Sequence, residues 1–126
     1  MNTVQEYANL VNSDFKVARA VIKDSVFWHE VIRCMPELKS EVVLNKFLPD
    51  DILLALAKDE DADIRLCVAM KRKLPHEALN ILSIDENDSV RMAIARNPKS
   101  PLDILEKMKN DSWTEVIRVI RGRLGD

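Results

Sequence analysis

The sequence predicts an all-α protein built from about four repeats of 26 residues, each folding into a pair of helices. The main observation is an internal alignment, since residues 48–73 and residues 74–99 fall into one register without a gap. A second observation is that proline, aspartate and aliphatic residues recur at constant positions in successive repeats. These positions are Pro49, Pro75 and Pro101; Asp59, Asp85 and Asp111; Leu38, Ile64, Val90 and Val116; and Val42, Val68, Ile94 and Ile120.

The first half of each repeat predicts one helix and the second half predicts another. Ile52, Leu53 and Leu56 have the spacing of one helical face, and the next two repeats carry apolar residues at the matching positions. In the second half, Ile64 and Val68 lie four residues apart, which again places them on one helical face. A single repeat cannot bury these residues alone, so we expect neighbouring repeats to stack.

The residues at the predicted helix ends agree with this division. In the segment SPLD, Ser100 can cap the helix, Pro101 suits the first helical position, and Asp103 lies near the positive end of the helix. The second helix of a repeat is expected to begin after Asp61 or Asn87, because both residue types are good N-caps.

The repeats leave the start of the chain as an irregular N-terminal cap. A stack needs such a cap because its first apolar face has no preceding neighbour. Val17 and Val21 are expected to be apolar contacts of the cap, and Val26 and Phe27 those of the helix that follows. We expect a single domain over residues 1–126, with the cap at 1–23 and repeats at 24–47, 48–73, 74–99 and 100–124.

The composition is that of one packed domain, with 47% hydrophobic and 32% charged residues among 126. A net charge of -2 gives no overall attraction to nucleic acid or to an anionic membrane. The sequence shows no apolar run near the roughly 18 residues of a membrane-spanning helix and no secretion signal, so we expect a cytoplasmic protein. Cys34 and Cys67 are expected to be buried, reduced thiols.

Two segments carry a resemblance to a known family. Residues 56–69, LAKDEDADIRLCVA, and residues 82–105, LSIDENDSVRMAIARNPKSPLDIL, resemble bacterial HEAT-like α-solenoids, especially the leucine-rich repeat variant. The similarity covers about residues 36–124 and implies a right-handed α-solenoid whose second helices line the inner face and which binds other macromolecules. The repeat is slightly longer than in that variant, and the cysteine cluster that accompanies the variant in one known context is absent. An iron–sulfur site is therefore not implied.

The sequence contains no pattern that indicates catalysis, a metal site or a cofactor, and we expect a protein that is not an enzyme. His29 and His76 belong to different predicted helices, and neither has another metal ligand at a suitable spacing. Asp50 and Asp51 are adjacent carboxylates, but acids at a helix start are expected because they cap the helix and complement its dipole.

Charged residues gather at the two ends of the predicted second helices. Acids before a helix and bases after it stabilise the helix dipole, and the same groups can steer partners of opposite charge. The acidic edge comprises Asp59, Glu60, Asp61, Asp63, Asp85, Glu86 and Asp88, and the basic edge comprises Lys71, Arg72, Lys73, Arg96, Lys99, Arg121 and Arg123.

A column of basic residues is expected on the inner-facing side of the second helices. It consists of Lys39, Arg65 and Arg91 and continues one position out of register at Arg118. The column has two interpretations. It is either a partner-binding surface or an internal ladder in which each arginine pairs with one of the recurring aspartates.

Trp28 and Trp113 lie outside the recurring apolar positions. Exposed tryptophans often contribute strongly to protein interfaces, whereas large aromatic residues also close the open end of a repeat stack. The sequence is compatible with both interpretations.

The function that these features favour is the binding of another protein through the inner face and the charged edges. One alternative is nucleic-acid binding through the inner arginines and the basic edge, but 19 basic residues against 21 acidic ones disfavour it. Another alternative is a small inhibitor or immunity-type protein that neutralises a toxin or phage factor. The partner-binding candidates are Lys39, Arg65, Arg91, Arg118, Trp28 and Trp113.

Overall fold

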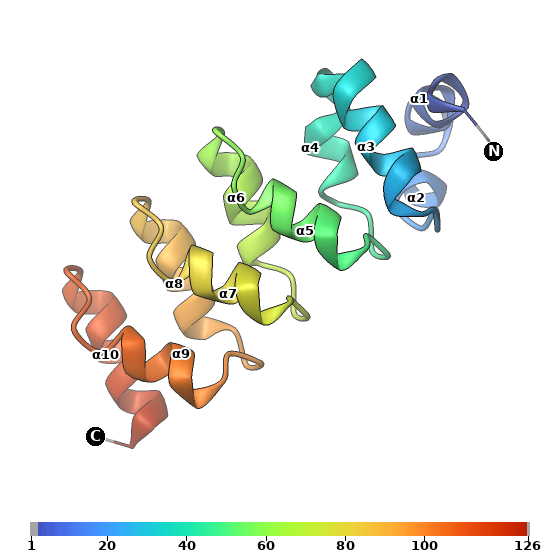
Figure 1. Cartoon of the computed structure of the whole chain (residues 1–126). Coiled ribbons are helices and arrows are strands. Elements are labelled where there is room, and N and C mark those ends of the chain that lie inside the picture. Colours follow the sequence, from blue (N-terminus) through green and yellow to red (C-terminus); the bar gives the residue numbers. More distant parts are fainter. Residues whose placement is uncertain (1–2, 126) are drawn as a thin grey trace. The chain divides into compact units, whose positions relative to one another are not determined.

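The computed structural model describes residues 3–125, and over this range the chain is helical without any β-strand (Figure 1). The all-α prediction is confirmed. Within the same range, no helix is both long and apolar enough to cross a membrane. The helices are α1 (Val4–Ser13), α2 (Phe15–Ala18), α3 (Ser25–Cys34), a 3₁₀ turn (Pro36–Leu38), α4 (Lys39–Val42), α5 (Asp50–Leu56), α6 (Ala62–Ala69), α7 (His76–Leu82), α8 (Asp88–Arg96), α9 (Leu102–Lys107) and α10 (Thr114–Leu124).

The helices belong to two compact units. The N-terminal unit ends at Leu56 and contains α1 to α5, and the C-terminal unit begins at Ala57 and contains α6 to α10. The boundary falls between the two helices of the predicted repeat 48–73. The single domain expected over residues 1–126 stays a prediction.

The core of the N-terminal unit is centred on two aromatic side chains. α1 packs against α2 and α3, and α3 packs against α5. Tyr7 from α1 and Trp28 from α3 are fully buried, and their ring centroids lie 5.2 Å apart with the rings nearly perpendicular. Edge-to-face packing of this kind is favourable beyond the area that it buries. Arg19 pairs with Glu41 at 2.9 Å and connects the end of α2 to α4.

The prediction of which apolar residues are buried in this unit is wrong in part. Val17 is 51% exposed and Val26 is 75% exposed, whereas the buried residues of α3 are Trp28 and Val31. Val26 and Trp28 are two residues apart and therefore face nearly opposite sides of a helix. Since Trp28 has the larger apolar surface and packs on Tyr7, α3 turns that side inward.

In the C-terminal unit, α8 packs between α6 and α10, while α7 packs against α8 and α9 against α10. Helices α6, α8 and α10 follow one another along one side and α7 and α9 along the other (Figure 1). The two recurring aliphatic positions are buried in all three second helices, which confirms the prediction for this unit. The residues are Ile64, Val68, Val90, Ile94, Val116 and Ile120.

The helix N-caps predicted for the second helices are confirmed. The carboxylate of Asp61 accepts a hydrogen bond from the backbone N–H two residues on at 2.8 Å, and the side chain of Asn87 does the same at 2.9 Å. These bonds satisfy backbone donors that have no partner inside the helix.

The cap predicted at Ser100 is wrong. α9 begins at Leu102 with Pro101 in the N-cap position, one residue later than expected. Ser100 is buried, and its hydroxyl donates to the carbonyl of Ile94 at 2.8 Å. The side chain therefore satisfies an acceptor at the end of α8 instead of the donors at the start of α9.

The two cysteines are free thiols, as predicted, but Cys34 is exposed and Cys67 is half-buried. The expectation of a buried thiol is therefore wrong for Cys34. This residue ends α3 on its exposed side, where its Sγ lies 3.6 Å from the carboxylate of Glu30 one helical turn earlier.

Candidate functional site

Arg65 and Arg91 form an internal ladder. Nε and Nη2 of Arg65 donate to the two carboxylate oxygens of Asp85 at 2.8 and 3.1 Å, and Arg91 binds Asp111 in the same way at 2.8 and 3.2 Å. The four side chains are only 5–12% exposed. Two parallel bonds make the strongest pairing between arginine and a carboxylate, and the bond to Asp85 raises the pKa of Arg65.

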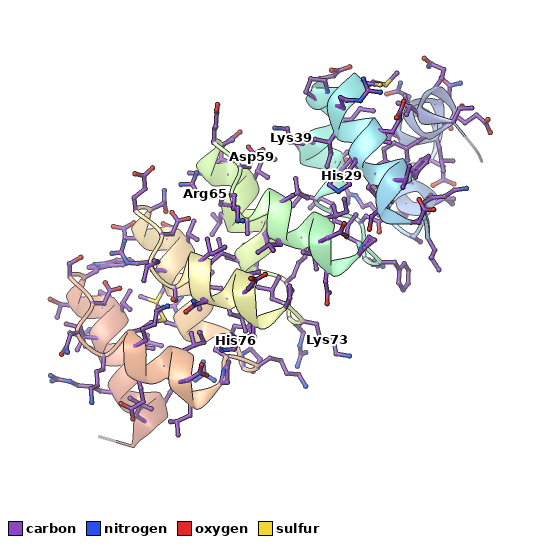
Figure 2. All side chains as sticks on the ribbon, in the orientation of Figure 1. His29, Lys39, Asp59, Arg65, Lys73 and His76 are labelled. Atoms are coloured by element: carbon purple, nitrogen blue, oxygen red, sulfur yellow. The ribbon has the colours of Figure 1, made fainter. Side chains whose placement is uncertain are left out.

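The recurring aspartates also hold the loops that precede the second helices. Asp59, Asp85 and Asp111 each accept a hydrogen bond from the backbone N–H two residues on, at 3.0, 2.9 and 2.8 Å. Nη1 of Arg65 donates to the carbonyl of Asp59 at 2.8 Å, and Arg91 repeats this bond with Asp85 (Figure 2). Each arginine therefore binds the loop before its own helix and the aspartate of the following loop. These contacts confirm the ladder interpretation for Arg65 and Arg91.

The other two members of the basic column lie outside this arrangement. Lys39 begins α4 in the N-terminal unit and is half-exposed. Arg118 is exposed and pairs with Glu115 on its own helix at 2.9 Å. Ile117 occupies the column position of Arg65 and Arg91 in α10.

Trp28 lies in the core, so its assignment as a partner-binding residue is wrong. Its ring makes edge-on contacts with Tyr7 at 5.2 Å and with Phe27 at 5.1 Å. In the described structure, neither Nε1 of Trp28 nor the hydroxyl of Tyr7 has a hydrogen-bond partner, and burial raises the pKa of Tyr7 to about 12. The geometry agrees with the alternative role, an aromatic residue that closes the cap.

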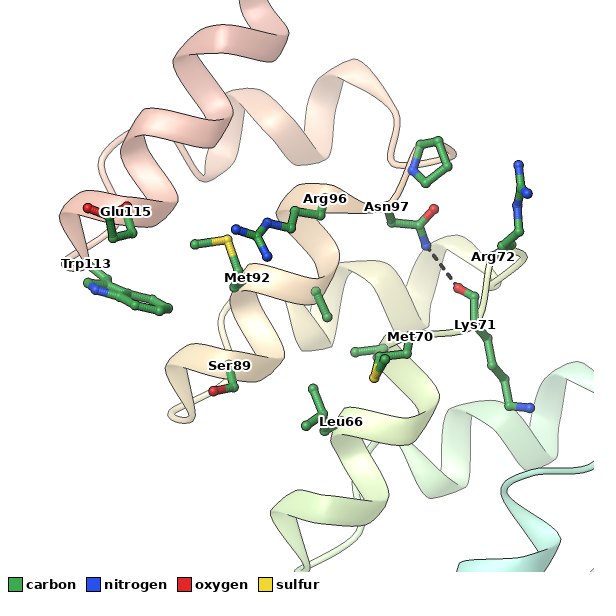
Figure 3. A pocket seen from close by; sticks show the side chains of 13 residues that line it. Leu66, Met70, Lys71, Arg72, Ser89, Met92, Arg96, Asn97, Trp113 and Glu115 are labelled. Atoms are coloured by element: carbon green, nitrogen blue, oxygen red, sulfur yellow. Dashed lines mark hydrogen bonds between the residues drawn. The ribbon is translucent and has the colours of Figure 1, made fainter.

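Trp113 borders a groove of about 650 Å³ on the exposed side of α6 and α8 (Figure 3). This volume is typical of clefts that hold a ligand. Leu66 and Met92 line the groove, Met70 is 70% exposed beside them, and Trp113 is half-buried at the other end. The groove therefore presents a mainly apolar surface with an aromatic residue at one end.

Helical spacing places these side chains together. Leu66 on α6 and Met70, the C-cap of that helix, are one turn apart, and Met92 and Arg96 occupy the corresponding positions on α8. They form a second stripe, on a side of each helix different from the buried aliphatic stripe. This stripe was not predicted from the sequence, although the repeat spacing between Leu66 and Met92 indicates that the two residues occupy equivalent positions.

Arg96 supplies a positive charge in the groove. Its side chain extends back along α8 toward Met92, with the guanidinium on the side of Glu115 and Trp113 (Figure 3). Among residues 3–125, no carboxylate forms an ion pair with Arg96, since Glu115 pairs with Arg118 instead. Long side chains on a helix commonly point toward its N-terminus in this way.

The residues of the predicted basic edge do not all lie in one place in the structure. The groove lining includes Lys71, Arg72 and Arg96, whereas Lys73, Lys99 and Arg121 are exposed outside it. Burial lowers the pKa of Lys71, and Figure 3 shows its side chain pointing away from Met92. Arg123 has a structural role, because it donates to the carbonyls of Ala95 and Asn97, both at 2.7 Å.

The residues of the acidic edge also differ, since some have structural contacts and others are exposed. Asp59 and Asp85 belong to the ladder and Asp61 caps α6, so these three carboxylates already have structural roles. The side chain of Glu86 is 92% exposed and lies 3.8 Å from Arg65. The remaining acids of this edge, all exposed, are Glu60, Asp63 and Asp88.

A second structural column was missed by the sequence analysis. Asn45 donates through Nδ2 to the carbonyl of Val21 at 2.8 Å, Asn97 donates to that of Lys71 at 3.1 Å, and Arg123 donates to that of Asn97. Asn45 and Asn97 are buried and lie two repeats apart in the sequence. Each bond satisfies a backbone acceptor that follows a helix.

The two histidines connect neighbouring first helices. His76 on α7 lies 2.6 Å from Asp103 on α9, and His29 on α3 lies 3.5 Å from Asp51 on α5 (Figure 2). The bond from His76 lowers the pKa of Asp103, and bonds from Ser25 and then His29 lower that of Asp51. Exposed pairs of this kind contribute little to stability. Nowhere in the described range do three potential metal ligands come together.

Comparison with protein-family models, curated proteins and solved structures finds no match for this chain. The groove and the charges around it are therefore the features of this chain that bear on its function.

Proposed function

We propose that this chain is a non-enzymatic, cytoplasmic protein-binding module, folded as a right-handed α-solenoid of about four helix pairs behind an N-terminal cap. Two observations in the C-terminal unit support the repeat architecture. The bonds of Arg65 to Asp85 recur between Arg91 and Asp111, one repeat later. Helix α8 also packs against both α6 and α10, as the middle member of a stack does.

The observation that carries the functional proposal is the apolar groove beside Trp113. Met70 exposes 70% of its surface there, next to the half-buried Leu66. Contiguous apolar surface of this kind is typical of an interaction site. Methionine adapts its shape to different apolar partners, and tryptophan is enriched among the residues that dominate binding energy.

Two features favour a protein partner over nucleic acid. Arg65 and Arg91 already bind carboxylates, so they are not available to neutralise phosphate groups. Glu115 is exposed at the Trp113 end of the groove and would repel the closely spaced charges of a phosphate backbone more strongly than a single carboxylate. Binding through the remaining basic residues should be non-specific, with a dissociation constant of roughly 10⁻⁴ M or weaker at physiological salt.

A pull-down with matched variants tests this function. Met70 in the groove and Ile84 in the turn after α7 are both 70% exposed, so Ile84→Asp is a control for Met70→Asp. We expect affinity-tagged wild type and Ile84→Asp to retain a protein from native lysate that Met70→Asp loses. Identical captured proteins for all three would contradict the proposal. A salt-sensitive mobility shift of duplex DNA or RNA at micromolar protein would favour the nucleic-acid alternative.

A further inference from the structure

Arg96 differs from four other arginines of this unit, because its guanidinium has no partner within the described range. Arg65 and Arg91 bind buried aspartates, Arg118 binds Glu115, and Arg123 binds backbone carbonyls. Arg96 nevertheless lies in the groove, beside Met92 (Figure 3). No ion pair among residues 3–125 neutralises this cation, although Glu115 also lines the groove.

The end of α8 does not require Arg96 for its own stability. A cation near a helix C-terminus complements the dipole and can bind the last carbonyl groups. Those carbonyls already have donors, since Ser100 binds that of Ile94 and Arg123 binds that of Ala95. The Arg96 side chain also points back toward Met92 and away from the helix end (Figure 3). Its position in the groove is therefore not explained by capping.

We propose that the groove binds a segment of a partner protein in which an apolar side chain lies next to a carboxylate. This inference rests on the protein-binding function proposed above. The apolar side chain would pack on Leu66, Met70 and Met92, and the aspartate or glutamate would bind the guanidinium of Arg96. Arginine is suited to this role because it donates two parallel hydrogen bonds to a carboxylate.

The surroundings of Arg96 favour a carboxylate on an apolar segment over a phosphate. An apolar side chain bound beside the exposed guanidinium of Arg96 would exclude water from it and so strengthen the ion pair. The apolar surface of Leu66 and Met70 offers no partner to a nucleic-acid backbone, whereas it matches an aliphatic or aromatic side chain.

The test is a selection of random 12-residue peptides displayed on phage against the immobilised full-length chain. Parallel selections use Arg96→Glu and the control Arg121→Glu, which makes the same charge change at an exposed arginine outside the groove. We expect wild type and Arg121→Glu to enrich peptides with an acid beside an apolar residue, and Arg96→Glu to lose that preference in favour of lysine or arginine. Thermal unfolding midpoints check that each variant is folded.

Fluorescence polarisation of the most enriched peptide then measures affinity. We expect a loss of roughly tenfold or more for Arg96→Glu and for Met70→Asp, and no change for Arg121→Glu. Enriched peptides without acids, or equal affinity for Arg96→Glu, would overturn the inference and leave the protein-binding function standing. Absence of any enrichment would also overturn it. The proposed function fails as well only if the pull-down finds no protein that depends on Met70.

Discussion

Replacing Arg91 with methionine should remove the centre of the ladder while keeping the length of the side chain. The substitution deletes two bonds to Asp111, at 2.8 and 3.2 Å, and two to the carbonyls of Asp85 and Glu86, at 2.8 and 3.3 Å. The carboxylate of Asp111 is only 5% exposed, and the hydrogen bond that it keeps comes from the backbone N–H of Trp113. The variant therefore contains a buried charge without its counter-ion.

The loss of one partner from a buried pair costs about 3–5 kcal/mol of unfolding free energy. For a chain of this length, each kcal/mol corresponds to roughly 4 °C in the thermal midpoint, so we expect Arg91→Met to unfold roughly 12–20 °C below wild type. The double variant Arg91→Met/Asp111→Asn should recover part of this loss, because it removes the unpaired charge as well.

Thermal and urea unfolding followed by far-UV circular dichroism measure the effect. Arg96→Met is the matched control, since it makes the same substitution at an exposed arginine one and a half turns later on α8. We expect the control to stay within about 0.5 kcal/mol of wild type. If Arg91→Met proved as stable as Arg96→Met, the ladder would not hold the unit together and the reasoning would be refuted.

Three further predictions concern other contacts. Asn97→Ala removes the donor to the Lys71 carbonyl and should cost about 1–3 kcal/mol in urea unfolding, and unchanged stability would show that the buried amide is dispensable. His76 lowers the pKa of Asp103, so the stabilisation is present above the ordinary aspartate pKa of about 4 and is lost as pH falls through the lowered value. The midpoints of wild type and Asp103→Asn should therefore converge at acidic pH, whereas a constant gap would contradict the pairing. Truncation after Lys73 should leave an aggregating or unfolded fragment, and a monomeric, helical fragment in size-exclusion chromatography would exclude obligatory stacking.

The ladder was one of two interpretations that the sequence allowed, because its members recur with one spacing. Arg65 and Asp85 are 20 positions apart, and so are Arg91 and Asp111. A constant offset between two columns requires similar contacts in each repeat, but it does not decide between an aspartate of the same repeat and one of the next. The aliphatic columns could be assigned to the core because they too recur with one spacing.

The irregular parts of the chain could not be predicted in this way. The environment of Trp28 depends on Tyr7, which belongs to a cap segment without a counterpart in any repeat. The hydroxyl of Ser100 can donate or accept a hydrogen bond. It donates to the carbonyl of Ile94, six positions earlier, and the local sequence does not reveal that this carbonyl lies within reach. The position of Arg96 in the groove likewise depends on which helix neighbours α8.

The ladder also makes residues 74–99 self-complementary. Asp85 receives the arginine of the preceding repeat, and Arg91 reaches the aspartate of the following one, with nearly identical bond lengths. A tandem copy of this segment would therefore carry both the aspartate and the arginine that its new neighbours require.

Duplication of this segment would lengthen the groove that we propose as a binding site, by one repeat for each copy. Each inserted copy would add another methionine at the position of Met92 and another cation at that of Arg96. Under the proposed function, a chain with such copies would bind longer segments whose carboxylates are spaced like its own repeats.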